Sequence, residues 1–284
     1  MRSTGAKASA IGTAVLLGSA VLTGCGGDGE PEAGKPAAAG ESTGGRQQST
    51  QAVRGAYEKT AEADTAKMTV RVKAAAEGKT VDSDGKGAID FEDGDSTMTV
   101  TAQGRTVEQR VVDQVLYQKV PGQKKDGKSW MKIDLREVAE QQGADPGQIG
   151  DPAQSAAYAK AISDDDVSEA GSEKINGVDT VRYDVSVDVS RLPGGQRLRE
   201  QVGPTLPMRL WLDDDGRIRR QRIDMTVKAP ASAEPKASGS PQQVKVSTVM
   251  EFTDFGTDVD AEAPPADQVA DVTDQVARQG QKRS

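Results

Sequence analysis

The feature that most constrains this chain is an alternation of apolar and polar side chains with a period of two residues. Met68 and Val70 alternate with Thr69 and Arg71, and the same pattern returns many times before residue 252. Successive side chains of a β-strand point to opposite faces of a sheet, whereas a helix needs apolar positions three and four residues apart. The pattern therefore predicts many strands, each with one apolar and one polar face.

The alternating runs follow one another closely. Six strands are expected in succession between residues 68 and 133, and segments rich in Gly and Asp, such as residues 82–85 and 93–95, predict turns between them. Asn176-Gly177 is the strongest hairpin signal of the chain. Short connections of this kind favour antiparallel pairing. Further strands are expected at residues 167–174, 181–189, 208–212, 218–228 and 244–252.

Helical spacing of apolar residues occurs in only a few segments. Residues 52–63, 135–142, 153–162 and 196–202 are expected to form helices. A twisted sheet of about ten strands tends to curl, and so few helices cannot cover both faces of a flat sheet. We therefore expect an α+β fold with a single large curved antiparallel sheet, a half-barrel of about ten strands, and helices packed in its concave face.

The N-terminal residues have the pattern of an export signal. Arg2 and Lys7 precede a run of apolar and small residues that is shorter than the roughly 20 apolar residues of a membrane-spanning helix. The run ends in Leu22-Thr23-Gly24-Cys25, which resembles the lipobox of bacterial lipoproteins. This resemblance implies recognition of Leu22, Thr23 and Gly24, cleavage of a signal peptide at residues 1–24, and a lipid on Cys25, the only cysteine of the chain.

The composition changes after this signal. Residues 25–51 are mostly Gly, Ala, Ser, Thr, Pro, Gln and Glu, and they predict a flexible tether behind the lipidated cysteine. One folded domain is expected at residues 52–263, and residues 264–284 are expected to form a polar C-terminal tail. The lipid would hold the domain at the outer, extracytoplasmic face of the cell membrane.

The composition excludes several functions. The net charge is −8, and removal of Arg2 and Lys7 with the signal peptide leaves −10, which disfavours a nucleic-acid partner. Histidine is absent, which removes the usual general base and the commonest metal ligand. There is no G-x-S-x-G elbow and no free cysteine once Cys25 is acylated. We expect no catalytic residues, no metal and no cofactor.

Two kinds of charged cluster could bind ligands. Residues 164–166 and 213–215 are runs of three aspartates, but neither matches a calcium loop, and the second lies where a hairpin needs turn residues. Arg217, Arg219, Arg220 and Arg222 are expected to lie on a solvated face of a strand. The alternative is that some of these arginines bind a phosphorylated headgroup in a bidentate manner.

Three segments resemble a known family. Residues 129–135 read S-W-M-K-I-D-L, residues 177–185 read G-V-D-T-V-R-Y-D-V, and residues 207–218 read P-M-R-L-W-L-D-D-D-G-R-I. With the lipobox and the order of elements, they resemble the LppX/LprG-type envelope lipoproteins of actinobacteria, which belong to the LolA-like superfamily. The likeness covers residues 52–260. It implies an unclosed barrel that holds the acyl chains of a membrane lipid or lipoglycan between sheet and helices.

The alternation locates the expected cavity. If residues such as Arg71 and Arg182 face solvent, the apolar side chains of the same strands point into the curve of the sheet. A sheet face has the same pattern whether it lines a cavity or a filled core, so tryptophan at position 100 or 185 should be accepted only if a cavity is present. The expected lining residues are Val70, Val72, Ile89, Phe91, Met98, Val100, Val181, Tyr183, Val185, Leu210, Leu212, Ile223 and Met225.

The resemblance leaves more than one function open. The first is that the protein binds a lipid or lipoglycan in an apolar cavity and carries or presents it. The alternative is an envelope sensor or scaffold lipoprotein that acts through a membrane protein partner, since LolA-like folds also occur in sensor proteins. Lipid that co-purifies with the protein would favour the first function.

Overall fold

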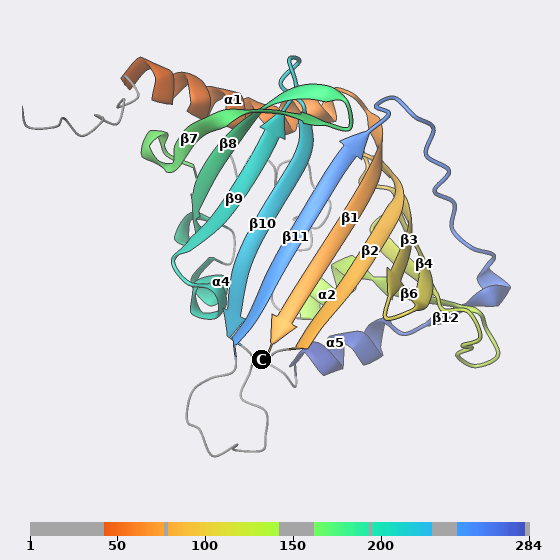
Figure 1. Ribbon diagram of the computed structural model, residues 1–284. Helices are drawn as coiled ribbons and strands as arrows, with labels where there is room; N and C mark the ends of the chain where they lie inside the picture. The colour runs from red at the N-terminus through yellow and green to blue at the C-terminus, as the bar shows by residue number, and fades with distance from the viewer. Residues whose placement is uncertain (1–42, 77–78, 142–161, 193–194, 229–242, 282–284) are drawn as a thin grey trace, which may run out of the picture. The chain divides into compact units, whose positions relative to one another are not determined.

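Twelve strands form one sheet in the order β12-β6-β5-β4-β3-β2-β1-β11-β10-β9-β8-β7 (Figure 1). The computed structural model describes residues 43–76, 79–141, 162–192, 195–228 and 243–281. All of these residues lie in one compact unit, Glu41–Ser284. The strands are β1 (Thr65–Ala76), β2 (Lys79–Asp90), β3 (Ser96–Ala102), β4 (Arg105–Val112), β5 (Val115–Lys119), β6 (Trp130–Asp134), β7 (Val167–Ile175), β8 (Val178–Asp188), β9 (Thr205–Leu212), β10 (Ile218–Lys228), β11 (Gln243–Thr253) and β12 (Val269–Asp271).

Most neighbouring strands are joined by tight hairpins, as the short Gly- and Asp-rich connections predict. Asn176 and Gly177 have φ values of 50° and 86°, and they join β7 to β8 with Ile175 paired to Val178. Two consecutive positive φ values are typical of the type I′ turn, whose twist matches that of the strands. The predicted Asn-Gly hairpin is therefore confirmed.

The predicted turn at residues 82–85 is wrong, because these residues lie inside β2 and pair with β1. Gly85 faces the side chain of Met98, whose sulfur would lie 2.8 Å from a Cβ atom at position 85. At Gly87 a Cβ atom would lie 1.7 Å from the backbone oxygen of Thr97. The glycines that suggested a turn instead permit close approach of β3 to β2.

The sheet is open and curved, as expected for a half-barrel, but it has more strands than expected and is mixed (Figure 1). β12 pairs with β6 in parallel, with Val269 opposite Trp130. This strand lies in the segment expected to be a polar tail, and Ala270 is buried. A three-residue strand is too short to show alternation, so the sequence pattern could not reveal it.

Helix α1 (Thr43–Ala61) begins inside the segment expected to be a flexible tether. Its first residues contain little apolar surface, yet Ser49 and Thr50 are buried and the helix contacts β7 and β10. Tertiary packing has therefore extended the helix beyond the apolar pattern that predicted residues 52–63.

The other helices are short. α2 (Leu135–Gln141) and α4 (Gly195–Val202) match two predicted helices, whereas the helix expected at residues 153–162 falls almost entirely outside the described residues. α5 (Thr273–Gln281) lies in the expected tail and contacts α2 and β6. No helix in the described part of the chain has the length and apolar character that a membrane span requires. The described residues also form three 3₁₀ helices, η2 (Asp164–Asp166), η3 (Val189–Arg191) and η4 (Ala266–Gln268).

The register divides the sheet into two chemically different faces. The face that carries Val70, Leu210 and Ile223 is called the apolar face, and the face that carries Arg71 and Arg222 is called the charged face. Helix α1 packs on the apolar face, where the Tyr57 hydroxyl lies 3.5 Å from the sulfur of Met208. Sequence alternation thus becomes a two-sided sheet with its core on one side.

Candidate functional site

The expected lining residues lie on one face of the sheet. In the β-ladder, Val70 is opposite Met250, and Leu210 is opposite both Gln221 and Tyr183. Val100 faces Gly85 across β2 and β3. Phe91 follows β2 directly, and its ring packs edge-on against Phe252 with a centroid distance of 5.5 Å. The structure therefore places on one face residues of six strands, β1, β2, β3, β8, β9 and β10, which the alternation pattern alone relates in the sequence.

Burial divides this set into two parts. Leu210 is 0% exposed, Leu212 3%, Val185 4% and Tyr183 9%, and all four belong to the main core cluster. A side chain with almost no accessible surface does not border a space that water or a ligand can enter. These four residues belong to the buried core of the described chain, so we expect tryptophan at position 185 to overpack it.

The other expected lining residues are only half-buried. They are spread over β10, β1, β2 and β3, with Val181 on β8 beside Leu212. Neighbouring apolar residues of β11, including Val246 and Met250, are half-buried as well. This part of the apolar face retains accessible apolar surface. The half-buried members of the expected set are Val70, Val72, Ile89, Phe91, Met98, Val100, Val181, Ile223 and Met225.

Two cavities bordered by described residues lie outside this half-buried part of the apolar face, and both have charged side chains in their walls. One of about 680 Å³ is bordered by α2, α5 and the loop before β6, with Glu137, Asp274 and Arg278 in its wall. Another of about 450 Å³ is bordered by η2, β8, β9 and β10, with Asp184 and Arg209 in its wall. Their charged walls suit water better than acyl chains.

Tyr57 and Gln221 contribute to the apolar face but are not among the expected lining residues. Tyr57 of α1 lies 3.4 Å from the amide oxygen of Gln221, which β10 places among apolar neighbours. Tyr183, one of the expected lining residues, is buried, and burial together with the charge of Glu169 raises the pKa of its hydroxyl.

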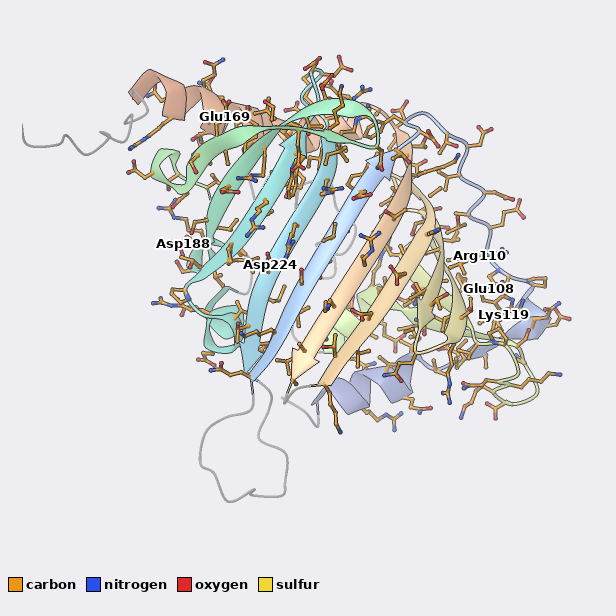
Figure 2. The ribbon with its side chains drawn as sticks, in the orientation of Figure 1. Glu108, Arg110, Lys119, Glu169, Asp188 and Asp224 are labelled. Atoms are coloured by element: carbon orange, nitrogen blue, oxygen red, sulfur yellow. The ribbon has the colours of Figure 1, made fainter. Side chains whose placement is uncertain are left out.

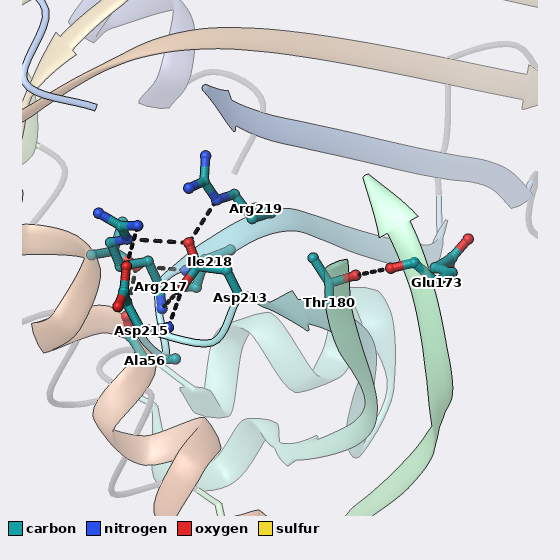
Figure 3. A network of polar contacts seen from close by, with 9 residues as sticks. Ala56, Glu173, Thr180, Asp213, Asp215, Arg217, Ile218 and Arg219 are labelled. Carbon is teal, nitrogen blue, oxygen red and sulfur yellow. Dashed lines mark hydrogen bonds and ion pairs between the residues drawn. The ribbon is translucent and has the colours of Figure 1, made fainter. Parts of the chain in front are cut away.

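The aspartate run at residues 213–215 forms a structural turn, as expected (Figure 3). The Asp213 carboxylate accepts hydrogen bonds from the backbone N–H groups of Asp215 and Arg217 and from the Nε atoms of Arg217 and Arg219, at 2.7–3.1 Å. Burial disfavours the charged form of Asp213, but these hydrogen bonds and the two guanidinium charges outweigh it and lower the pKa. The Asp213 carboxylate therefore uses its hydrogen-bonding capacity to hold the turn and the two arginines.

The aspartate run at residues 164–166 also has a structural role. Residues 164–166 form η2, where the Asp166 carboxylate accepts a hydrogen bond from the Ser163 backbone N–H at 2.8 Å. Asp165 lies 3.5 Å from Arg46 of α1. Among the described residues no group of three or more acidic or cysteine side chains is arranged to hold a metal ion.

Arg217, in the turn before β10, and the three arginines of β10 are paired with carboxylates. Arg217 and Arg219 bind Asp213, Arg220 binds Glu251 at 2.6 Å, and Arg222 binds Asp224 at 2.9 Å. Each positive charge is already matched by a carboxylate, which weakens the alternative that they bind a phosphorylated headgroup. The register places Glu251 of β11 and Asp224 of β10 beside the arginines, and the turn after β9 supplies Asp213.

The charged face is held by similar pairs elsewhere in the sheet. Figure 2 shows Glu108 and Arg110 on β4 and Lys119 on β5, where Lys119 binds Glu108 at 3.0 Å. The cations of Arg110 and Lys119 lie 5.1 Å and 5.6 Å from the ring centre of the buried Trp130. Cation–π contacts and ion pairs therefore replace a second apolar core on this side.

The comparison with protein families decides what kind of chain this is. The model of the LppX_LprAFG lipoprotein family matches residues 48–259, most of the chain. The chain belongs to this family. The match begins within α1 and ends after β11, so it contains the apolar face and every one of the expected lining residues. No curated protein matches the chain.

The chain is also similar to several solved structures. Mycobacterium tuberculosis lipoprotein LppX is 13% identical over 75% of this chain and 99% of its own, with a TM-score of 0.47. LprF from Mycobacterium bovis is 17% identical over 78% of this chain and 98% of its own, with a TM-score of 0.44. A LolA superfamily protein from Nitrosomonas europaea is 11% identical over 77% of this chain and 96% of its own, with a TM-score of 0.22. The family assignment itself rests on the family model.

Proposed function

We propose that this lipoprotein binds the acyl chains of a membrane lipid or lipoglycan against the apolar face and carries or presents that molecule at the outer face of the cell membrane. The observation that supports the proposal is the extended half-buried apolar surface of β10, β11, β1, β2 and β3. Surfaces of this kind on a soluble domain mark sites where an apolar partner binds.

The chemistry of this surface suits acyl chains. Its side chains are mainly Val, Met and Ile, which offer apolar contact without charge. Each methylene group that leaves water contributes about 0.8 kcal/mol. An acyl chain that covers only part of this surface therefore buries enough methylene groups to bind favourably. The nine half-buried residues named above are the proposed lining of this site.

Native mass spectrometry of the purified protein tests the proposal. We expect bound species with masses of acyl-containing lipids, which organic extraction removes. A lipid-free protein that instead co-purifies with a membrane protein would support the sensor or scaffold alternative and contradict the carrier proposal.

Substitution by tryptophan should separate the open and filled parts of the apolar face. Val100→Trp, at a half-buried position, should lower lipid occupancy and leave cooperative unfolding within about 1 kcal/mol of the wild type, because the added ring enters accessible space. Val185→Trp, at a position 4% exposed, should destabilise the fold by about 3 kcal/mol or more. Thermal melts and native mass spectra of both variants provide the measurements. Equal destabilisation by the two variants would show that position 100 is also filled.

We also propose that Cys25 carries the lipid anchor, on the basis of the lipobox and membership of a lipoprotein family. The intact mass of the membrane-bound protein should lack residues 1–24 and include added acyl groups. Two acyl chains give stable anchoring where one is marginal. Cys25→Ala should leave the chain without acyl mass, and an unmodified wild-type precursor would contradict the assignment.

A further inference from the structure

Two glutamines lie side by side on the apolar face. Gln109 of β4 and Gln118 of β5 are directly opposite in the antiparallel ladder. Directly opposite residues of an antiparallel pair have Cβ atoms about 5 Å apart on one face of the sheet. The register continues from this pair to Met98 on β3 and to Met131 on β6, so the glutamines lie between two methionines.

The surroundings of this pair are apolar along the strands as well. Val107 and Val111 are the neighbours of Gln109 on the same face, and Leu116 is the neighbour of Gln118. Both glutamines are half-buried. Neither side-chain amide has a hydrogen-bond partner within the part of the chain that the structure describes. Two partly buried amides therefore retain free donors and acceptors inside an apolar lining.

The charges near the pair are few. From β9 across the sheet to β6, the register places two charged side chains outside the Asp213 network on this face, Arg105 of β4 and the exposed Lys79 at the start of β2, counting only described residues. Arg105 is exposed and begins β4, about 13 Å along the strand from Gln109. An ionic group at the glutamines would have no opposite charge to compensate its lost hydration.

We propose that Gln109 and Gln118 form a subsite for an uncharged hydrogen-bonding group of the bound lipid, such as an ester carbonyl or a hydroxyl. The inference rests on the proposed lipid binding and deepens it, because it assigns the ligand a neutral polar group that sits within the apolar surface. An amide pair offers both donors and acceptors, so it recognises such a group in either orientation. The phosphate of a charged lipid is excluded from this position.

The test uses the intact mature chain in mild detergent, stripped of co-purified lipid, with two probes that share acyl chains: dioleoylglycerol and dioleoylphosphatidate. The test variant is Gln109→Met/Gln118→Met, since methionine is unbranched, similar in length and already present on both sides of the pair. The control is Gln243→Met, an exposed glutamine on the charged face of β11. Native mass spectrometry measures binding, and thermal melts verify folding.

We expect the wild type and the control to bind dioleoylglycerol more tightly than dioleoylphosphatidate, and the double variant to bind dioleoylglycerol at least about fivefold more weakly, as loss of two hydrogen bonds implies. If binding were purely apolar, the double variant would bind dioleoylglycerol more tightly than the wild type, because methionine would favour contact with the acyl chains. Unchanged or tighter binding by the double variant, or preference of the wild type for the phosphatidate, overturns the subsite.

Two further outcomes are informative. If the double variant does not unfold cooperatively, Gln109→Met and Gln118→Met are measured singly, and each should weaken dioleoylglycerol binding by about twofold or more. If the wild type binds neither probe and carries no native lipid, the lipid-binding proposal fails, and the subsite fails with it. Binding by the wild type with no effect of the substitutions refutes the subsite alone.

Discussion

Replacement of Asp213 by alanine is expected to destabilise the protein by about 3 kcal/mol. The carboxylate is 4% exposed and accepts four hydrogen bonds, so its removal leaves the guanidinium groups of Arg217 and Arg219 without their shared partner (Figure 3). Both guanidiniums also lie over the ring of Phe255, at 4.9 Å and 4.6 Å, and they lose the anchor that holds them there. Denaturant unfolding measures the loss.

The matched control is Asp215→Ala in the same turn. The Asp215 side chain is 69% exposed and pairs only with Arg217, so its loss should change stability by less than about 1 kcal/mol. Equal effects at positions 213 and 215 would show that the buried carboxylate is not the centre of this network.

Asp213 also predicts how stability depends on pH. Its pKa is lower in the folded protein than the usual value near 3.8. The stabilising contribution is therefore fully present above the unfolded pKa of about 3.9 and is lost as the pH falls through the lower folded value. The difference in unfolding free energy between wild type and Asp213→Asn should accordingly shrink below about pH 4. A difference that stays constant down to pH 2 would contradict this assignment.

Replacement of Leu210 by alanine should destabilise the fold by about 3–4 kcal/mol and lower the Tm by about 10 °C. Leu210 is 0% exposed, and it lies between Tyr183 on β8 and Gln221 on β10. Tight packing allows little collapse around the deleted atoms, so a cavity adds to the lost burial of the side chain. Calorimetry or a thermal melt gives the measurement.

Val72→Ala provides the comparison on the open part of the apolar face. Val72 is half-buried and lies outside the main core cluster, so its truncation should cost about 1 kcal/mol or less. Similar costs at positions 72 and 210 would mean that the two parts of the apolar face are packed alike, which would remove the structural support for a lipid site.

The local pattern predicts those elements whose side chains alternate over many residues. Every second residue is apolar from Val181 to Val187 in β8 and from Leu206 to Leu212 in β9, and Asn176-Gly177 joins β7 to β8 as expected. Tertiary contacts decide the remaining elements. β2 runs through a turn-like segment because its glycines admit Met98 and the backbone of β3, and β12 exists because β6 offers an unpaired edge.

The same division applies to the candidate site. Alternation alone placed thirteen residues on one face of the sheet, because the direction of a strand side chain depends only on its position in the chain. Whether that face is filled depends on what packs against it, and α1 and its neighbours bury Val185 and Leu210 while Val70 and Val100 stay half-buried. The pairing of Gln109 with Gln118 depends on the register between β4 and β5, which only the folded sheet determines.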